Sequence, residues 1–122
     1  MHEMAICQAL IDQLEALAAS HGATRVTRVL LRIGPLSGVE PALLDSAFGL
    51  ARAGTVAEQA SLRIEQLPVR VSCRCCGRTS EAAANRLLCG HCGDYRTRLV
   101  SGDELQLARA ELEIPDAAQA AG

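Results

Sequence analysis

The sequence has almost no aromatic residues and no lysine, and both features restrict what the protein can bind. Phe48 and Tyr95 are the only aromatic residues. Proteins that bind single-stranded nucleic acid usually stack bases on aromatic side chains, so this kind of recognition is disfavoured. All 12 basic residues are arginine, and 14 acidic residues bring the net charge to −2. The chain therefore lacks the basic excess that is typical of nucleic-acid-binding proteins.

Long apolar segments are also missing, although apolar residues make up 49% of the 122 residues. No apolar run approaches the roughly 20 residues that a membrane-spanning helix needs. The start, Met1-His2-Glu3, has neither the basic nor the apolar stretch of a secretory signal. We therefore expect a cytoplasmic protein without a membrane partner and with reduced cysteines. In that setting, clustered cysteines indicate a metal site rather than disulfides.

Hydrophobic periodicity predicts the order helix, strand, helix, strand, cysteine module, strand. Apolar residues recur at helical spacing in residues 4–21, whereas apolar and polar residues alternate in 25–33. A second helix should begin near Pro41 and end at Gly54, because proline suits a first helical turn and glycine suits a helix end. Two further strands are predicted, at residues 61–66 and 104–114.

The predicted fold class is α+β, with two helices packed on one face of a small sheet of about three strands and an inserted zinc-ribbon-like module. Residues 1–70 and 100–114 should form the body, and residues 71–99 the zinc-binding module. Residues 115–122 are expected to be a disordered tail. The apolar residues of the last strand change parity near Ala108, which suggests a β-bulge and leaves a short helix as an alternative.

Four cysteines form two Cys-x-x-Cys pairs, Cys73 with Cys76 and Cys89 with Cys92. Two such pairs at this separation are a strong zinc signal, because each turn directs two thiolates at one tetrahedral ion. A shell of four cysteines has no open coordination position, so the expected zinc site is structural and not hydrolytic. The module is too short for a hydrophobic core, and bound metal must supply much of its folding free energy.

Other residues leave alternatives open around these pairs. Cys75 could replace Cys76 as the second ligand of the first pair. Cys76 is favoured, because it is followed by a glycine, as is Cys92 in the second pair. His91 lies inside the second turn and is a further candidate ligand. Cys7 falls on the first predicted helix, where a buried structural thiol is the favoured interpretation. The arginines of the module either offset the charge of the thiolates or bind nucleic acid, and the acidic remainder of the chain favours the first reading.

The amino terminus offers a second group of metal ligands. The α-amine of Met1, the backbone amides that follow and the imidazole of His2 can close adjacent chelate rings around one ion. Planar sets rich in nitrogen suit Ni²⁺ or Cu²⁺ better than Zn²⁺. A histidine at position 2 is often no more than a solvated residue, so this pattern is a weak signal when taken alone.

In combination, these features resemble the HypA/HybF family of nickel metallochaperones, which serve NiFe-hydrogenase maturation. The resemblance covers about residues 1–113 and rests on the order and spacing of its pieces. These are MHEMAICQAL, RIGPLSGVEPALL, GTVAEQASLRIE, the two Cys-x-x-Cys pairs and SGDELQLARAELE. The chain departs from the family at Gly90, where relatives often have proline, and in its additional Cys75.

The resemblance implies a binding and delivery protein, in keeping with the lack of any recognisable catalytic triad, phosphate loop or carboxylate pair. Nickel would be bound at the terminus by His2, Met1 and Glu3, as a transferred cargo. Zinc would be held as a structural ion by Cys73, Cys76, Cys89 and Cys92. The implied partners are a HypB-type GTPase and the hydrogenase large-subunit precursor, and some members also serve urease.

Two other functions remain as alternatives. A zinc ribbon can serve as a nucleic-acid-binding or transcription adaptor, and a Cys-x-x-Cys protein can be redox-active. Metal-bound thiolates exchange poorly with disulfides, which disfavours the redox alternative.

Overall fold

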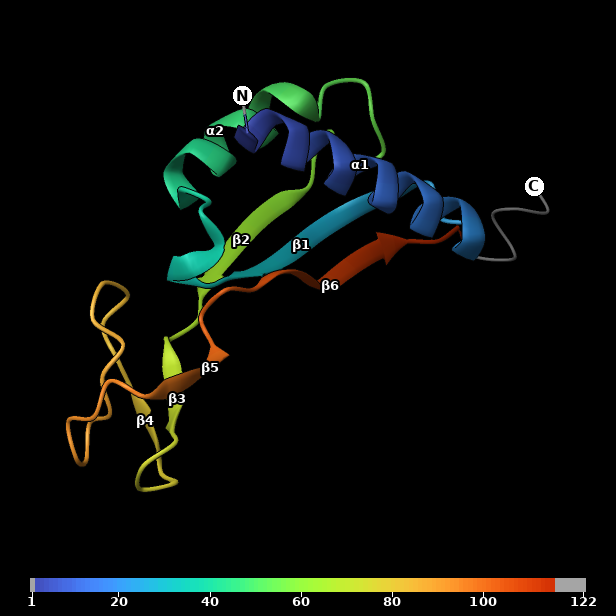
Figure 1. Ribbon diagram of the computed structural model, residues 1–122. Helices are drawn as coiled ribbons and strands as arrows, with labels where there is room; N and C mark the ends of the chain where they lie inside the picture. Colours follow the sequence, from blue (N-terminus) through green and yellow to red (C-terminus); the bar gives the residue numbers. More distant parts are fainter. Residues whose placement is uncertain (1, 116–122) are drawn as a thin grey trace. The chain divides into compact units, whose positions relative to one another are not determined.

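The computed structural model describes residues 2–115 of the chain. Its helices and long strands follow the predicted order (Figure 1), with three further short strands in the cysteine-containing segment, and the predicted fold class is confirmed. The elements are α1 His2–His21, β1 Arg25–Ile33, the 3₁₀ turn η1 Pro35–Ser37, α2 Pro41–Ala51, β2 Ser61–Gln66, β3 Arg70–Cys73, β4 Thr79–Glu81, β5 Thr97–Ser101 and β6 Leu105–Glu113. The predicted disordered tail lies, apart from Pro115, outside the described residues.

The strands form two three-stranded sheets, with the orders β2-β1-β6 and β4-β3-β5. The backbone also divides into two compact units. The first unit comprises Met1–Leu31, Glu40–Ile64 and Leu107–Gly122, and the second comprises Arg32–Val39 and Glu65–Gln106. The second unit thus contains both cysteine pairs and extends beyond them in both directions along the chain.

In the first unit, α1 and α2 lie over one face of the sheet (Figure 1). The core between these layers is aliphatic apart from one ring. Leu14 of α1 and Leu44 of α2 are completely buried, and Phe48 is 1% exposed. Val29 and Leu31 of β1 complete this core, while Leu30 between them is half-buried and the neighbouring Arg28 is exposed. The alternation of β1 therefore confirms the predicted strand with one buried face.

The last strand runs antiparallel to β1. The backbone N–H of Thr24 donates to the carbonyl of Glu113 at 2.9 Å, and the Thr27 hydroxyl donates to the carbonyl of Glu111 at 3.2 Å. The partner residue numbers thus fall along β6 as they rise along β1. Because β6 continues from Leu105 to Glu113, the structure excludes the short helix considered for this segment.

The sheet of the second unit was not predicted from the sequence. Its central strand, β3, pairs antiparallel with β4 and β5, with Val71 opposite Ser80 on one side and Leu99 on the other. Val69 is 4% exposed and Val71 is fully buried, so the unit has a small apolar centre of its own. The edge strands β4 and β5 have three and five residues, too few to show a clear hydrophobic period.

Gly34 lies where two backbone segments of the second unit come very close. Its N–H donates to the carbonyl of Glu104 at 2.9 Å, and the N–H of Leu36 donates to the carbonyl of Gly102 at 2.7 Å. A Cβ atom added to Gly34 would stand 2.0 Å from the Gly102 oxygen. Position 34 therefore has no room for any side chain.

We expect Gly34→Ala to reduce the free energy of unfolding by about 2 kcal/mol or more, because the clash is with backbone that cannot rotate away. Gly49→Ala in α2 is the matched control, since a Cβ there meets nothing within 4 Å. Alanine favours a helix over glycine by up to about 1 kcal/mol, so the control should be slightly stabilised. Urea unfolding followed by circular dichroism compares the two, and equal stability of both variants would contradict this account.

Candidate metal centre

Four cysteine sulfurs converge in the second unit. The Sγ atoms of Cys73, Cys76, Cys89 and Cys92 all lie within 4.8 Å of one another. Across the two turns, the Cys73–Cys92 and Cys76–Cys89 Sγ pairs are each 3.6 Å apart. In a tetrahedral shell with Zn–S bonds of 2.3 Å, neighbouring sulfurs stand about 3.8 Å apart. The spacing of these thiols therefore fits a four-coordinate zinc ion.

Backbone N–H groups hold the first turn in place around one sulfur. The N–H groups of Cys75 and Cys76 donate to Cys73 Sγ at 3.3 and 3.4 Å. Gly77, with a φ of 76°, donates its N–H to the carbonyl of Cys73, and the Cys73 N–H donates to the carbonyl of Arg78. Cys75 is exposed and contributes its amide to the turn, while its thiol lies outside the converging set.

The second turn repeats this hydrogen-bonding pattern at the same relative positions. His91 and Cys92 donate their N–H groups to Cys89 Sγ at 3.3 and 3.4 Å. Gly93, with a φ of 75°, closes the turn, and the Cys89 N–H donates to the carbonyl of Asp94. The two turns thus present their sulfurs as equivalent halves of one site, and His91 is exposed.

Gly90 makes a contact that proline could not make. Its N–H donates to the hydroxyl of Ser80 at 2.8 Å. Proline has no N–H, and a Cβ at position 90 would stand 3.2 Å from the Cβ of Ser80. The second turn is therefore tied to β4 through a hydrogen bond that a proline at position 90 could not donate.

The backbone bonds also shift the pKa values of the thiols. The N–H groups of Cys92 and His91 lower the pKa of Cys89 to about 6, against the opposing effect of burial. Cys92 differs: the Asp94 N–H lowers its pKa, but the bond to Cys73, burial and the bond to Cys89 raise it to about 12. Protons are thus shared unevenly across the cluster. A metal ion must displace them, so metal affinity falls as pH falls.

An ion pair fixes the loop that follows the second turn. Arg96 donates to the Asp94 carboxylate from Nε at 3.0 Å and from Nη2 at 2.8 Å. These hydrogen bonds lower the pKa of Asp94 to about 2. The Arg96 carbonyl accepts the N–H of Arg74, so the same loop reaches the first turn. The sequence analysis did not single out this pair, and its only signal was an acid two residues before an arginine.

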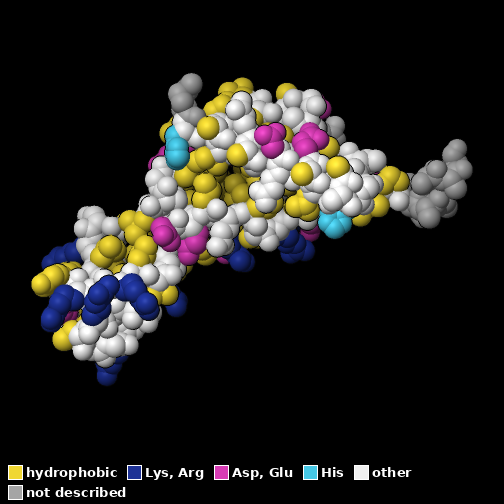
Figure 2. Space-filling view, turned by 45° about the vertical axis from the view of Figure 1, so that its right-hand side comes forward, with side chains coloured by type: hydrophobic (Ala, Val, Ile, Leu, Met, Phe, Trp, Pro, Cys, Tyr) yellow, Lys and Arg dark blue, Asp and Glu magenta, His cyan; other side chains and the backbone are white. Residues whose placement is uncertain are grey.

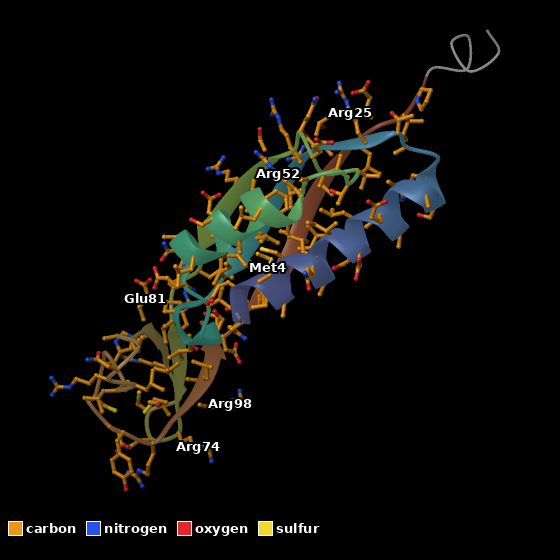
Figure 3. All side chains as sticks on the ribbon, turned by 90° about the horizontal axis from the view of Figure 1, so that it is seen from above. Met4, Arg25, Arg52, Arg74, Glu81 and Arg98 are labelled. Carbon is orange, nitrogen blue, oxygen red and sulfur yellow. The ribbon has the colours of Figure 1, made fainter. Side chains whose placement is uncertain are left out.

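Arginine side chains gather on the unit that carries the cysteines (Figure 2). Arg74 and Arg98 lie on the same side of it (Figure 3). Together with Ser72 and Cys73 they line a cavity of about 390 Å³ beside the cluster. Their positive charge offsets the negative charge that four thiolates would bring to one divalent ion.

Of the nickel ligands expected at the amino terminus, His2 and Glu3 fall in the first turn of α1. His2 is exposed and Glu3 is half-buried, whereas Met1 lies outside the described residues. Cys7 follows one turn later, completely buried as predicted, and its Sγ donates to the carbonyl of Leu44 in α2 at 3.4 Å. Burial and the charge of Glu3 raise the pKa of Cys7. This protonated thiol holds the start of α1 against α2.

A family model described as "Hydrogenase/urease nickel incorporation, metallochaperone, hypA" matches residues 1–112. The chain belongs to the HypA family. The Hydrogenase maturation factor HypA of Nitrosospira multiformis is 54% identical over 112 residues, which cover 92% of this chain and 97% of that protein. The Aquifex aeolicus factor is 42% identical over 114 residues, covering 93% and 99%.

Solved structures agree with this assignment. The solution structure of the Ni metallochaperone HypA from Helicobacter pylori matches with a TM-score of 0.68 at 26% identity, over 93% of this chain and 98% of that one. Members of the family are metallochaperones and not enzymes, which confirms the expected class. Neither helix within residues 2–115 is long and apolar enough to cross a membrane.

We expect Cys76→Ser to lose zinc and to unfold the second unit, because three thiolates and a hydroxyl cannot maintain the shell. Cys75→Ser, one residue away, should keep its zinc, since its thiol lies outside the cluster. Metal analysis of the purified proteins measures zinc content, and amide NMR spectra report which unit unfolds. Zinc loss in the Cys75 variant and retention in the Cys76 variant would reverse the ligand assignment.

Proposed function

We propose that this protein is a nickel metallochaperone that binds Ni²⁺ at its amino terminus and delivers it to the NiFe-hydrogenase large-subunit precursor. Membership of the HypA family over residues 1–112 carries this proposal. The names of the relatives, hydrogenase maturation factors, support the hydrogenase as the destination. The exposed position of His2 supports the terminus as the place where an ion can enter and leave.

The start of α1 suits a nickel site built from nitrogen atoms. The first backbone N–H groups of a helix have no partner within the helix. The amides of His2 and Glu3 can therefore give up their protons to a metal without breaking helical hydrogen bonds. The α-amine of Met1 and the His2 imidazole complete the proposed set. Glu3 adds a negative charge where the positive end of the helix dipole would otherwise repel a cation.

The cysteine cluster has a different proposed role. Cys73, Cys76, Cys89 and Cys92 hold Zn²⁺ as a structural ion, because four sulfurs fill a tetrahedral shell and leave no position for a substrate. The bound ion fixes the two turns to each other. Nickel is thus the cargo, and zinc is part of the fold.

The proposed partners follow from the delivery step. A HypB-type GTPase and the hydrogenase large-subunit precursor would meet the protein in the cytoplasm. Urease maturation proteins form a further partner class, since the family description includes urease. A nucleic-acid adaptor is the second candidate function, and the arginines around the cysteine turns are the observation in its favour.

His2→Ala should abolish specific Ni²⁺ binding and hydrogenase maturation while zinc content stays unchanged. Its imidazole is the one side-chain nitrogen in the proposed set, and the amine and amides alone make a weaker site. His21→Ala is the matched control, since His21 is also exposed and stands at the other end of the same helix. Calorimetric nickel titration of untagged protein with its native terminus measures both variants.

A second treatment separates the terminal site from other nickel sites. Acetylation of the Met1 amine should be as damaging to nickel binding as His2→Ala, because both remove a nitrogen from the same set. Wild-type nickel affinity in the acetylated protein would refute the terminal site. Specific DNA binding by a protein that binds no nickel would instead support the adaptor function.

A further inference from the structure

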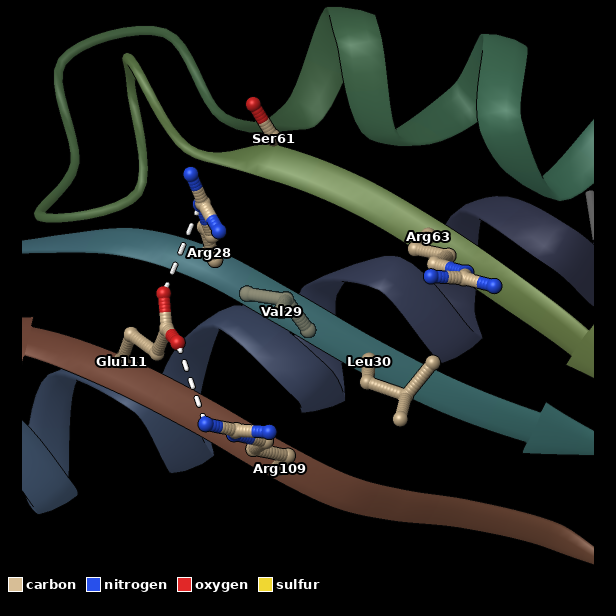
Figure 4. Close-up of a pocket in the computed structure, with 7 residues that line it drawn as sticks. All are labelled: Arg28, Val29, Leu30, Ser61, Arg63, Arg109 and Glu111. Atoms are coloured by element: carbon tan, nitrogen blue, oxygen red, sulfur yellow. Dashed lines mark ion pairs between the residues drawn. The ribbon is translucent and has the colours of Figure 1, made fainter.

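The open face of the first unit's sheet contains a pocket that neither proposed metal site uses. Its volume is about 390 Å³. Three neighbouring strands contribute to it (Figure 4), while the helices cover the other face of this sheet (Figure 1). The side chains that matter here are Arg28 and Leu30 of β1, Ser61 and Arg63 of β2, and Arg109 and Glu111 of β6.

Positive charge exceeds negative charge in this pocket. Glu111 is shared by two arginines: its Oε2 lies 3.4 Å from Arg28 Nε, and its Oε1 lies 3.3 Å from Arg109 Nη2. The two arginine side chains are 74% and 71% exposed, so they can accept another partner. Among residues 2–115 of the first unit, no carboxylate pairs with Arg63. The pocket lining thus contains one carboxylate and three guanidinium groups.

Elsewhere along these strands, arginines pair one to one with glutamates. Arg25 pairs with Glu113, and Arg32 pairs with Glu65. Such pairing is what solvated sheet faces use for cross-strand stability. The pocket departs from this one-to-one pairing and has a local excess of positive charge, although the chain as a whole has a net charge of −2. This excess can attract an anionic partner that the described residues of the unit do not supply.

We propose that this pocket docks an extended acidic segment of a partner protein. Arg63 and Arg109 stand on the two outer strands of the order β2-β1-β6, which places their backbones about 10 Å apart. Figure 4 shows their guanidinium groups on either side of Leu30. An extended peptide places alternate side chains on one face about 7 Å apart, so two carboxylates that flank an apolar residue stand about 14 Å apart. Two long arginine side chains on backbones about 10 Å apart can reach both carboxylates by extending away from Leu30.

The chemistry of arginine supports this occupant. Guanidinium groups bind carboxylates through two parallel hydrogen bonds, which gives such contacts orientation as well as charge. Leu30 is half-buried and presents apolar surface between the charges. The recognised pattern is therefore acidic, apolar, acidic at alternate positions. The inference is independent of the nickel and zinc proposals, because it uses none of their ligands.

The test uses the full-length chain, labelled with ¹⁵N, and an acetylated and amidated peptide Gly-Glu-Ser-Leu-Ser-Glu-Gly. The peptide should shift the amide signals of residues 28–30, 61–63 and 109–111, and its affinity should fall with added salt. The double variant Arg63→Gln/Arg109→Gln should bind about tenfold more weakly, as expected for two lost exposed ion pairs. Arg78→Gln/Arg86→Gln, with the same change in charge in the second unit, should bind like wild type.

A third variant should move the affinity in the opposite direction. Glu111→Gln removes the one carboxylate of the pocket and frees Arg28 and Arg109, so the peptide should bind several-fold more tightly. Partial unfolding would weaken binding and cannot produce this result. The proposal is overturned if the peptide fails to shift these signals, if both double variants bind alike, if Glu111→Gln weakens binding, or if equimolar inorganic phosphate displaces the peptide. The last outcome would identify a small-anion site instead.

Discussion

Four sulfur atoms held within 4.8 Å of one another form the constraint on which the second unit depends. Thiolates at such distances repel each other, and thiols must share protons unevenly, as the divergent pKa values of Cys89 and Cys92 show. One divalent cation offsets the repulsion between thiolates and replaces the shared protons. Other parts of the unit hold the four sulfurs together. The first cysteine turn follows β3, and the Asp94–Arg96 ion pair fixes the loop after the second turn. The surrounding arginines offset the negative charge of the thiolates.

The nickel site proposed for the first unit has requirements opposite to those of the cysteine cluster. A structural ion needs a full shell, but a cargo ion needs ligands that can release it. The start of α1 is suited to the second demand, because the imidazole of His2 is exposed and the first amides of a helix have no helical partner. Cys7 then anchors that end through its bond to the carbonyl of Leu44. The proposed labile site would thus lie on a helix that packs against α2, which would keep its ligands in place while the ion is exchanged.

The sheet of the first unit separates two kinds of surface. One face packs against the helices through residues such as Val29 and Leu31 and stabilises the unit. The other face carries charged side chains, and around Glu111 two arginines share one carboxylate. The imbalance therefore marks the part of the sheet where an external charge is expected.

Local patterns in the sequence were sufficient to predict many of the secondary-structure elements and the cysteine cluster. Helical spacing in residues 4–21, the alternation of 25–33 and the two Cys-x-x-Cys frames all depend on neighbours along the chain, and the structure has each of them. Tertiary structure alone decided the remainder. The β4-β3-β5 sheet joins short strands whose few residues show no period, and the bond from Gly90 to Ser80 spans ten residues. The arginine pocket combines residues of β1, β2 and β6, because hydrogen bonding between strands, not sequence distance, determines which side chains become neighbours.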